Sequence, residues 1–146
     1  GPFEERVIFP IYKADRLTYY VGRSYTPREP KYLNAPVPKA GNIFKTFVDR
    51  VDSAIICEGI FDAIKIGKKY PAICILGKVI NGNDQIISIA KATKKAYVLL
   101  DRDAQKEGFI ASQVLNYYIP TQVMLLEVTK DPGDLTDEQL EKILPK

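Results

Sequence analysis

The sequence predicts an α/β fold in which a mostly parallel four-stranded sheet is flanked by helices and preceded by a small β-hairpin and an extended loop. Two β-branched and aromatic runs open the chain, and a proline-rich stretch follows them. From residue 53 onward, short continuous apolar runs alternate with segments of helical periodicity. Continuous apolar runs are typical of strands that are buried on both faces, as in parallel sheets. The length of 146 residues and the 46% hydrophobic content fit one soluble domain of ordinary size.

The first fifty residues contain the hairpin and the loop. Residues 6–12 and 17–23 are separated by a short polar segment, so they predict two paired strands. Pro10 marks an edge or bulge position in the first strand. Four prolines within residues 24–42 predict an extended, irregular loop. A short helix or turn is expected over residues 43–50.

The remaining residues predict alternating strands and helices. Strands are expected where the apolar runs are continuous, at residues 54–57, 72–76, 96–100 and 121–126. Helices are expected where apolar residues recur at helical spacing, at residues 61–69, 83–92, 107–118 and 135–144. The last helix begins at Thr136, a good capping residue. Right-handed crossovers would connect parallel strands of this kind. We therefore divide the chain into residues 1–50, the hairpin with a basic loop, and residues 51–146, the α/β domain.

The composition excludes several classes of protein. The chain has no histidine, so it cannot contain a Ser-His-Asp or Cys-His catalytic arrangement. Its two cysteines, Cys57 and Cys74, lie in apolar runs and are expected to be buried thiols in a reducing compartment. No apolar run approaches the roughly 18 residues of a membrane span, so a cytoplasmic location is expected. Gly1-Pro2 resembles the remnant of a cleaved expression tag, and we expect the natural chain to extend upstream.

The net charge of +3 is unevenly distributed. Residues 1–50 hold nine Lys or Arg against five Asp or Glu, whereas residues 101–146 hold five against nine. A basic front and an acidic rear suit a protein that holds a polyanion on one surface and a divalent cation on another, although solvated surface charge gives the same pattern.

Three carboxylates fall where the functional crevice of a doubly wound sheet lies, at the carboxyl ends of the strands. Glu58 follows the first predicted strand, and Asp101 and Asp103 follow the third. In an extended strand end, residues two apart point to the same side, so both aspartates are expected to face one ion. Such oxygen ligands suit Mg²⁺. Gly59 permits a close approach of a phosphate or a helix, and Asp62 either supports the site or caps the next helix.

These residues resemble the TOPRIM family, which includes bacterial-type primases, topoisomerases, recombination mediators and some nucleases. The matching elements are Glu58-Gly59 with Asp62, and Asp101-Arg102-Asp103. Within that family the chain looks most like a bacterial or phage DnaG-like primase. Six further segments support this likeness: residues 6–12, 21–23, 31–36, 44–45, 76–77 and 130–132. The sequence departs from the primase pattern after Asp103 and at Gly77-Lys78-Val79, which indicates a divergent, phage-encoded type of member.

The resemblance implies metal-dependent nucleotidyl transfer in RNA primer synthesis. Glu58, Asp101 and Asp103 would be the catalytic residues and would hold Mg²⁺ or Mn²⁺. Phosphates of the template or of a nucleotide would be bound by Arg23, Lys31 and Lys45. Supporting roles are expected for Gly59, Asp62, Asn34, Lys130 and Asp131. Single-stranded DNA template, ribonucleoside triphosphates and a replicative helicase are the expected partners, and the chain itself is expected to be monomeric. A TOPRIM nuclease and a non-catalytic nucleic-acid-binding module are the alternatives.

Overall fold

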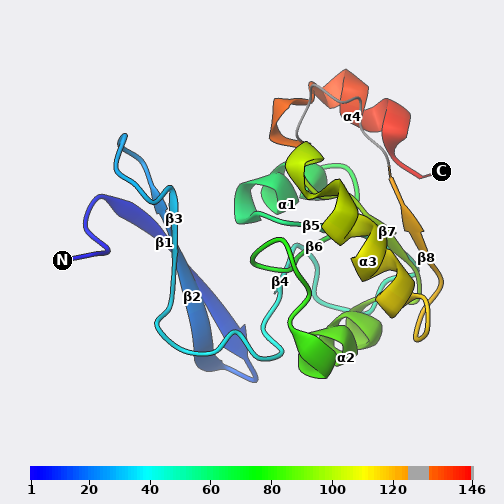
Figure 1. Cartoon of the computed structure of the whole chain (residues 1–146), viewed down its shortest axis with the longest axis horizontal. Coiled ribbons are helices and arrows are strands. Elements are labelled where there is room, and N and C mark those ends of the chain that lie inside the picture. The colour runs from blue at the N-terminus through cyan, green and yellow to red at the C-terminus, as the bar shows by residue number, and fades with distance from the viewer. Residues whose placement is uncertain (125–131, 146) are drawn as a thin grey trace.

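The computed structural model describes residues 1–124 and 132–145, and it contains two sheets that lie side by side (Figure 1). The smaller sheet has the order β1-β2-β3, and the larger has the order β4-β6-β5-β7-β8. The strands are β1 (Arg6–Lys13), β2 (Arg16–Ser24), β3 (Tyr32–Asn34), β4 (Phe44–Lys45), β5 (Ala54–Cys57), β6 (Ala72–Cys74), β7 (Ala96–Val98) and β8 (Thr121–Val123). The helices are α1 (Ile60–Gly67), α2 (Gly82–Ala92), α3 (Gln105–Leu115) and α4 (Asp137–Ile143), with short 3₁₀ turns η1 (Arg102–Ala104) and η2 (Pro132–Asp134).

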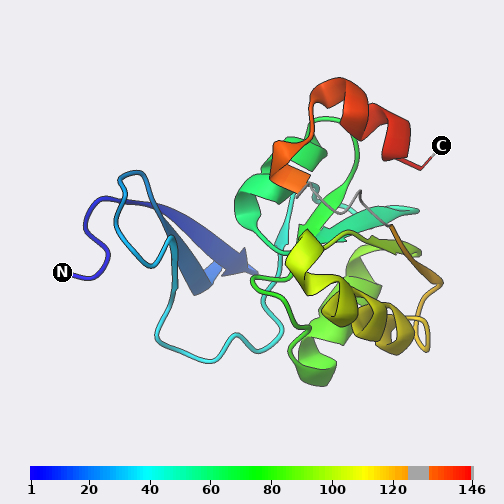
Figure 2. The same cartoon turned by 45° about the horizontal axis from the view of Figure 1, so that its top comes forward.

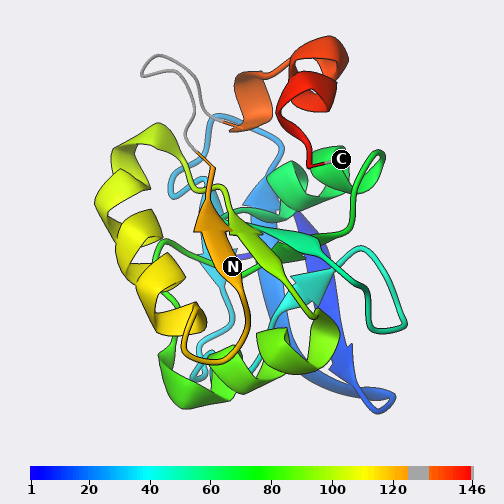
Figure 3. The same ribbon diagram turned by 90° about the vertical axis from the view of Figure 1, so that its right-hand side faces the viewer.

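The predicted α/β fold class is confirmed. The four predicted strands are present as β5 to β8, which pair in parallel, and β8 forms one edge of their sheet (Figure 3). β6 and β7 each end two residues earlier than predicted, and residues 125–126 of the last predicted strand lie outside the described residues. All four predicted helices are present, with ends that differ from the prediction by up to three residues. Thr136 caps α4 as predicted, because its hydroxyl accepts a hydrogen bond from the Gln139 backbone N–H.

Two short strands fall where the sequence predicted none. The predicted helix or turn at residues 43–50 is wrong in part, because β4 pairs antiparallel with β6 and adds a fifth strand to the sheet. The predicted loop at residues 24–42 contains β3, which pairs with β2 and extends the hairpin to three strands. Each of these strands has three residues or fewer, which is too short to show a hydrophobic period.

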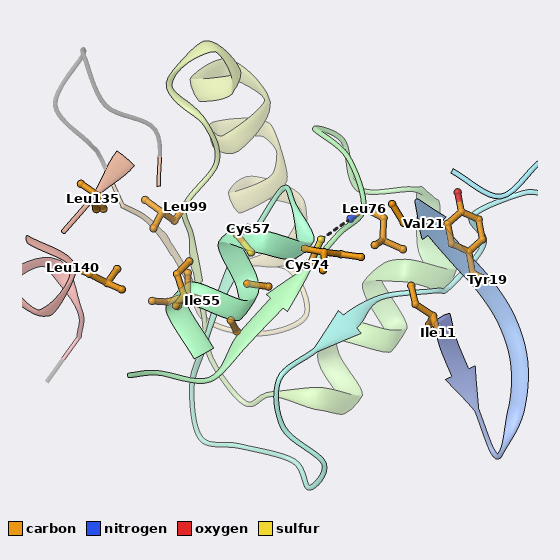
Figure 4. Close-up of a cluster of buried hydrophobic side chains, with 14 of the residues drawn as sticks. Ile11, Tyr19, Val21, Ile55, Cys57, Cys74, Leu76, Leu99, Leu135 and Leu140 are labelled. Atoms are coloured by element: carbon orange, nitrogen blue, oxygen red, sulfur yellow. Dashed lines mark hydrogen bonds between the residues drawn. The ribbon is translucent and has the colours of Figure 1, made fainter. Parts of the chain in front are cut away.

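The central strands β5 and β6 of the larger sheet are buried on both faces. Their residues alternate between two clusters, because neighbouring residues along a strand point to opposite sides. In β5, Ile55 and Cys57 join one buried cluster, whereas Ala54 and Ile56 join the other. The first cluster also contains side chains from α1, the hairpin and α4, together with Leu135 just after η2, and Figure 4 shows it extending from one sheet to the other. The second cluster contains side chains from α2 and α3. Each fully buried Ile or Leu contributes roughly 1.5–3 kcal/mol of hydrophobic stabilisation.

The hairpin and the C-terminal elements flank the edge of the sheet where β5, β6 and β7 end. Ile11, Tyr19 and Val21 of the hairpin pack in the same cluster as Leu76, which follows β6. On the opposite side, η2 and α4 lie against α1 (Figure 2). The ends of these strands therefore lie between the N-terminal hairpin on one side and the C-terminal η2 and α4 on the other. In the described part of the chain, no helix is both long and apolar enough to cross a membrane.

Candidate metal centre

Glu58 and Asp101 lie at the same edge of the sheet because they follow two neighbouring parallel strands. β5 and β7 pair in parallel, and the Leu99 N–H donates to the Ile56 carbonyl at 2.8 Å, which extends the pairing beyond β7. Glu58 directly follows β5, and Asp101 follows Leu100 at the end of the apolar run. The carboxyl ends of parallel strands therefore bring the two acids together, as the sequence predicted.

Asp103 reaches the same place by a different route from the one predicted. It lies in η1, a 3₁₀ turn closed by a hydrogen bond from the Ala104 N–H to the Asp101 carbonyl at 2.8 Å. The extended backbone expected for Asp101-Arg102-Asp103 is thus wrong after Asp101. The three carboxylates nevertheless converge: one oxygen from each of Glu58, Asp101 and Asp103 lies within 4.8 Å of the others.

The donor set fits a hard divalent cation. Glu58 and Asp101 are half-buried and Asp103 is exposed. The Glu58 Oε2 atom is buried and has no hydrogen-bond partner among the described residues. Burial, followed by the charges of Asp101 and Asp103, raises the pKa of Glu58 from 4.5 to about 7. A cluster of carboxylates that repel one another is stabilised by a divalent ion, and carboxylate oxygens are the ligands that such ions prefer.

Lys78 is the residue at this site that the sequence reasoning missed. Its Nζ atom makes an ion pair with Asp103 Oδ2 at 2.8 Å. Its charge also partly opposes the upward shift of the Glu58 pKa. The sequence marked Gly77-Lys78-Val79 only as a departure from the primase pattern; the lysine reaches the site because the chain turns at Leu76 and Gly77, both of which have positive φ.

We call the carboxyl ends of β5 and β7, with Glu58, Asp101 and Asp103, the acidic edge. A cavity of about 420 Å³ lies between this acidic edge and the small sheet. Predicted site residues from both sides line it: Lys31, Asn34, Glu58, Gly59, Asp62 and Asp101. Tyr32 also lines it, and the Tyr32 hydroxyl lies 3.5 Å from the point where a Cβ on Gly59 would be. The Asp62 carboxylate lies 3.3 Å from the same point, so the groups nearest to Gly59 are Tyr32 of β3 and Asp62, and the predicted approach of a phosphate stays a prediction.

The remaining predicted residues lie elsewhere. The Arg23 guanidinium is stacked on the rings of Tyr32 and Phe61, at 5.1 and 5.2 Å from their centroids. Its Nη1 donates to the Ser24 carbonyl at 2.9 Å. Lys45 is not part of the acidic cavity, because it lines a second cavity of about 680 Å³ together with Lys13 and Lys91. Lys130 and Asp131 lie outside the described residues.

Comparisons with known proteins point to one fold family. No protein-family model matches the chain. A DNA primase of Staphylococcus epidermidis is 30% identical over 148 aligned residues, which cover 90% of this chain and 24% of that primase. The Aquifex aeolicus primase structure, comprising zinc-binding and RNA polymerase domains, superimposes with a TM-score of 0.79 at 25% identity. It covers 97% of this chain and 39% of the compared chain. The chain contains a DnaG-like, TOPRIM-type domain.

A third comparison extends the likeness to both sheets. The DnaG primase catalytic domain solved with single-stranded DNA matches this chain with a TM-score of 0.72 and 23% identity, and it covers 97% of this chain and 54% of the compared chain. The TOPRIM-type domain and the hairpin before it thus follow the primase-core fold together. The chain spans about a quarter of the length of the Staphylococcus epidermidis primase.

Proposed function

We propose that the TOPRIM-type domain supplies the metal-holding half of a primase that synthesises RNA primers for DNA replication. The observation that carries this proposal is the convergence of Glu58, Asp101 and Asp103 at the strand ends of a DnaG-like fold. The relatives are primases, and none of the three comparisons favours the nuclease alternative. As the natural functional units we propose residues 1–50 and residues 51–146, although β4 of the first pairs with β6 of the second.

Glu58, Asp101 and Asp103 would bind the metal ions and orient the attacking hydroxyl in nucleotidyl transfer. Glu58, Asp101 and Asp103 would together hold Mg²⁺ or Mn²⁺, with Asp101 and Asp103 as the anchoring ligands, since one oxygen of each carboxylate lies within 4.8 Å of the others. When bound, the ions would stabilise the charge on the attacking and leaving oxygens of the phosphoryl transfer. Glu58 would in addition orient the attacking 3′-hydroxyl or a metal-bound water, because its carboxylate lies beside those of Asp101 and Asp103. The pKa of Glu58 is about 7 without a bound ion, and a divalent cation beside the carboxylate would lower it, so Glu58 would be ionised and able to accept a hydrogen bond.

The basic residues would hold the polyanionic substrates. Lys31 is exposed on the wall of the acidic cavity, where a triphosphate or a template phosphate would lie next to the ions. We propose the same role for Arg23 and Lys45, with Asn34 contacting a base. Single-stranded DNA is the proposed template, because a related primase domain has been solved with that ligand. Ribonucleoside triphosphates and a replicative helicase complete the proposed set of partners.

Template-directed synthesis by the full-length protein tests this function. We expect ribonucleotide incorporation with Mg²⁺ or Mn²⁺, and we expect its loss when Asp101→Asn and Asp103→Asn are combined. Residues 1–146 alone should make little or no product, since positioning two nucleotides and a template demands more than metal ligands. A full-length protein that never makes primers contradicts the proposal. Nicking of supercoiled DNA with Mn²⁺, in place of primer synthesis, favours the nuclease instead.

A further inference from the structure

Lys78 lies within the acidic edge, and its role there can be inferred from its contacts. Resting on the proposed function, we propose that Lys78 is an exchangeable counter-ion: it neutralises Asp103 before a divalent cation binds, and the cation then releases it to the phosphates of the incoming triphosphate. The lysine would thereby couple cation binding to triphosphate binding. Three features of the structure support this proposal.

The first feature is how firmly the Lys78 backbone is placed. Leu76 and Gly77, with φ values of +60° and +148°, turn the chain sharply after β6. The Gly77 N–H donates to the Glu58 carbonyl at 3.2 Å, so the turn is attached to the backbone of one of the acids. On the other side, Lys39 Nζ donates to the Val79 carbonyl at 3.1 Å. The backbone hydrogen bond from Gly77 to Glu58 therefore places the Lys78 Cα beside the acidic residues, independently of what the Lys78 side chain contacts.

A buried glutamine holds the segment that follows. Gln85 is fully buried in α2, and its Oε1 accepts a hydrogen bond from the Asn81 N–H at 2.7 Å. Its Nε2 donates to the Ile75 carbonyl at 2.9 Å, just before the turn. The loop from Ile75 to Asn81 is thus attached to the core at both ends. The backbone of Lys78 can therefore stay in place while its long side chain moves from one anionic partner to another.

The second feature is the exposure of the ion pair. The side chains of Lys78 and Asp103 are 46% and 65% exposed, so water competes for both charges. Exposed pairs of this kind contribute little to stability, and they exchange readily. A divalent cation carries twice the charge of the ammonium and can be shared by all three carboxylates. It therefore displaces Lys78 from Asp103, at a cost in cation affinity.

The third feature is the position of the ammonium relative to both ligands. The Lys78 ammonium contacts Asp103, which is the exposed member of the three acids, and the Lys78 side chain is itself half-exposed, so its charge lies on the solvent side of the cluster. A triphosphate bound by cations at this edge brings phosphate oxygens to the same outer side. The lysine ammonium is a compact donor that commonly binds phosphate. Lys78 thus exchanges one anionic partner for another as the site fills.

If Lys78 acts in this way, its removal should strengthen Mn²⁺ binding and weaken triphosphate binding. Lys78→Thr should bind Mn²⁺ on the order of tenfold more tightly, because a positive charge next to the cation is removed. With Mn²⁺ saturating, the same variant should bind ATP and inorganic triphosphate several-fold more weakly. Lys78→Arg keeps the charge and should retain both parental affinities to within about twofold. A lysine with only a structural role would not shift the two affinities in opposite directions.

Lys69→Thr is the matched control. Lys69 makes a similar exposed ion pair with Glu141, at 3.1 Å, and is absent from the acidic edge and its cavity. Titration calorimetry of the 146-residue chain and of the full-length protein gives the affinities, and Lys69→Thr should leave them unchanged. Equal Mn²⁺ affinity in Lys78→Thr and the parent overturns the inference, and so does unchanged triphosphate affinity. If the parent binds no Mn²⁺ at all, the metal site of the proposed function fails as well.

Discussion

Replacing Glu58 with glutamine should stabilise the metal-free protein at neutral and alkaline pH. The pKa of Glu58 is raised from 4.5 to about 7 by burial and by the charge of Asp101, so the folded state holds a proton that the unfolded state has lost. Between pH 4.5 and pH 7 the folded state binds more protons than the unfolded state, so the free energy of unfolding falls as the pH rises. Above pH 7 the full destabilisation is present. Glu58→Gln removes the charge and should abolish this loss.

The magnitude follows from the shift and from the exposure of the side chain. A shift of this size corresponds to about 3.4 kcal/mol of unfolding free energy if it is converted directly. Glu58 is only half-buried, so solvent screening reduces the expected effect to about 1–2 kcal/mol. For a chain of this length, that free energy corresponds to about 3–6 °C in the midpoint of thermal unfolding.

Thermal unfolding in the presence of EDTA, followed from pH 4 to pH 9, measures the effect. The parent and Glu58→Gln should unfold at similar temperatures near pH 4, and the variant should unfold at a higher temperature at pH 8. Glu138→Gln, at an exposed position in the first turn of α4, should retain the parental pH dependence. The reasoning is refuted if Glu58→Gln loses as much stability as the parent between pH 4.5 and pH 7.

Further predictions concern the cap, the packing and the basic surface. Thr136→Ala removes the hydroxyl that caps α4 and should lower the unfolding free energy by about 1 kcal/mol in denaturant titrations, whereas Thr136→Ser should retain most of it. Gly67→Ala places a methyl group 2.6 Å from Thr46 Cγ2 and should cost about 1–3 kcal/mol; combination with Thr46→Ser, which removes that methyl, should recover part of the loss. Lys31→Ala should weaken single-stranded DNA binding for all sequences and reduce the salt dependence of the affinity by nearly one unit of slope; an unchanged slope would exclude a phosphate contact.

Continuous apolar runs and helical periodicity predicted the parallel strands that place Glu58 and Asp101 together. Runs such as residues 54–57 are buried on both faces, so they have no polar position to confuse the pattern. Parallel strands then place their carboxyl ends at one edge, which is why Glu58 and Asp101 could be paired from sequence. Asp103 also converges, but through a 3₁₀ turn that depends on one local hydrogen bond.

The remaining parts of the site depend on tertiary geometry that no sequence period encodes. Lys78 reaches Asp103 because two residues with positive φ turn the chain, and its own neighbours in sequence give no sign of this. Lys45 was grouped with Lys31 by charge alone, although β4 places it against a different cavity. Arg23 lies between two aromatic rings that come from other elements of the fold. Charge predicts that a surface is basic, but packing decides which lysines and arginines lie near the acids.

Anomalous diffraction from crystals grown with Mn²⁺ tests the central claim most directly. If Glu58, Asp101 and Asp103 form the metal centre, an anomalous peak should lie between their carboxylates, at roughly 2.0–2.3 Å from the ligand oxygens. The same crystals should show the Lys78 ammonium away from Asp103, and crystals of the Asp101→Asn, Asp103→Asn double variant should lack the peak. An Mn²⁺ peak only elsewhere on the protein, or none at a concentration that stabilises the parent against unfolding, would contradict the account.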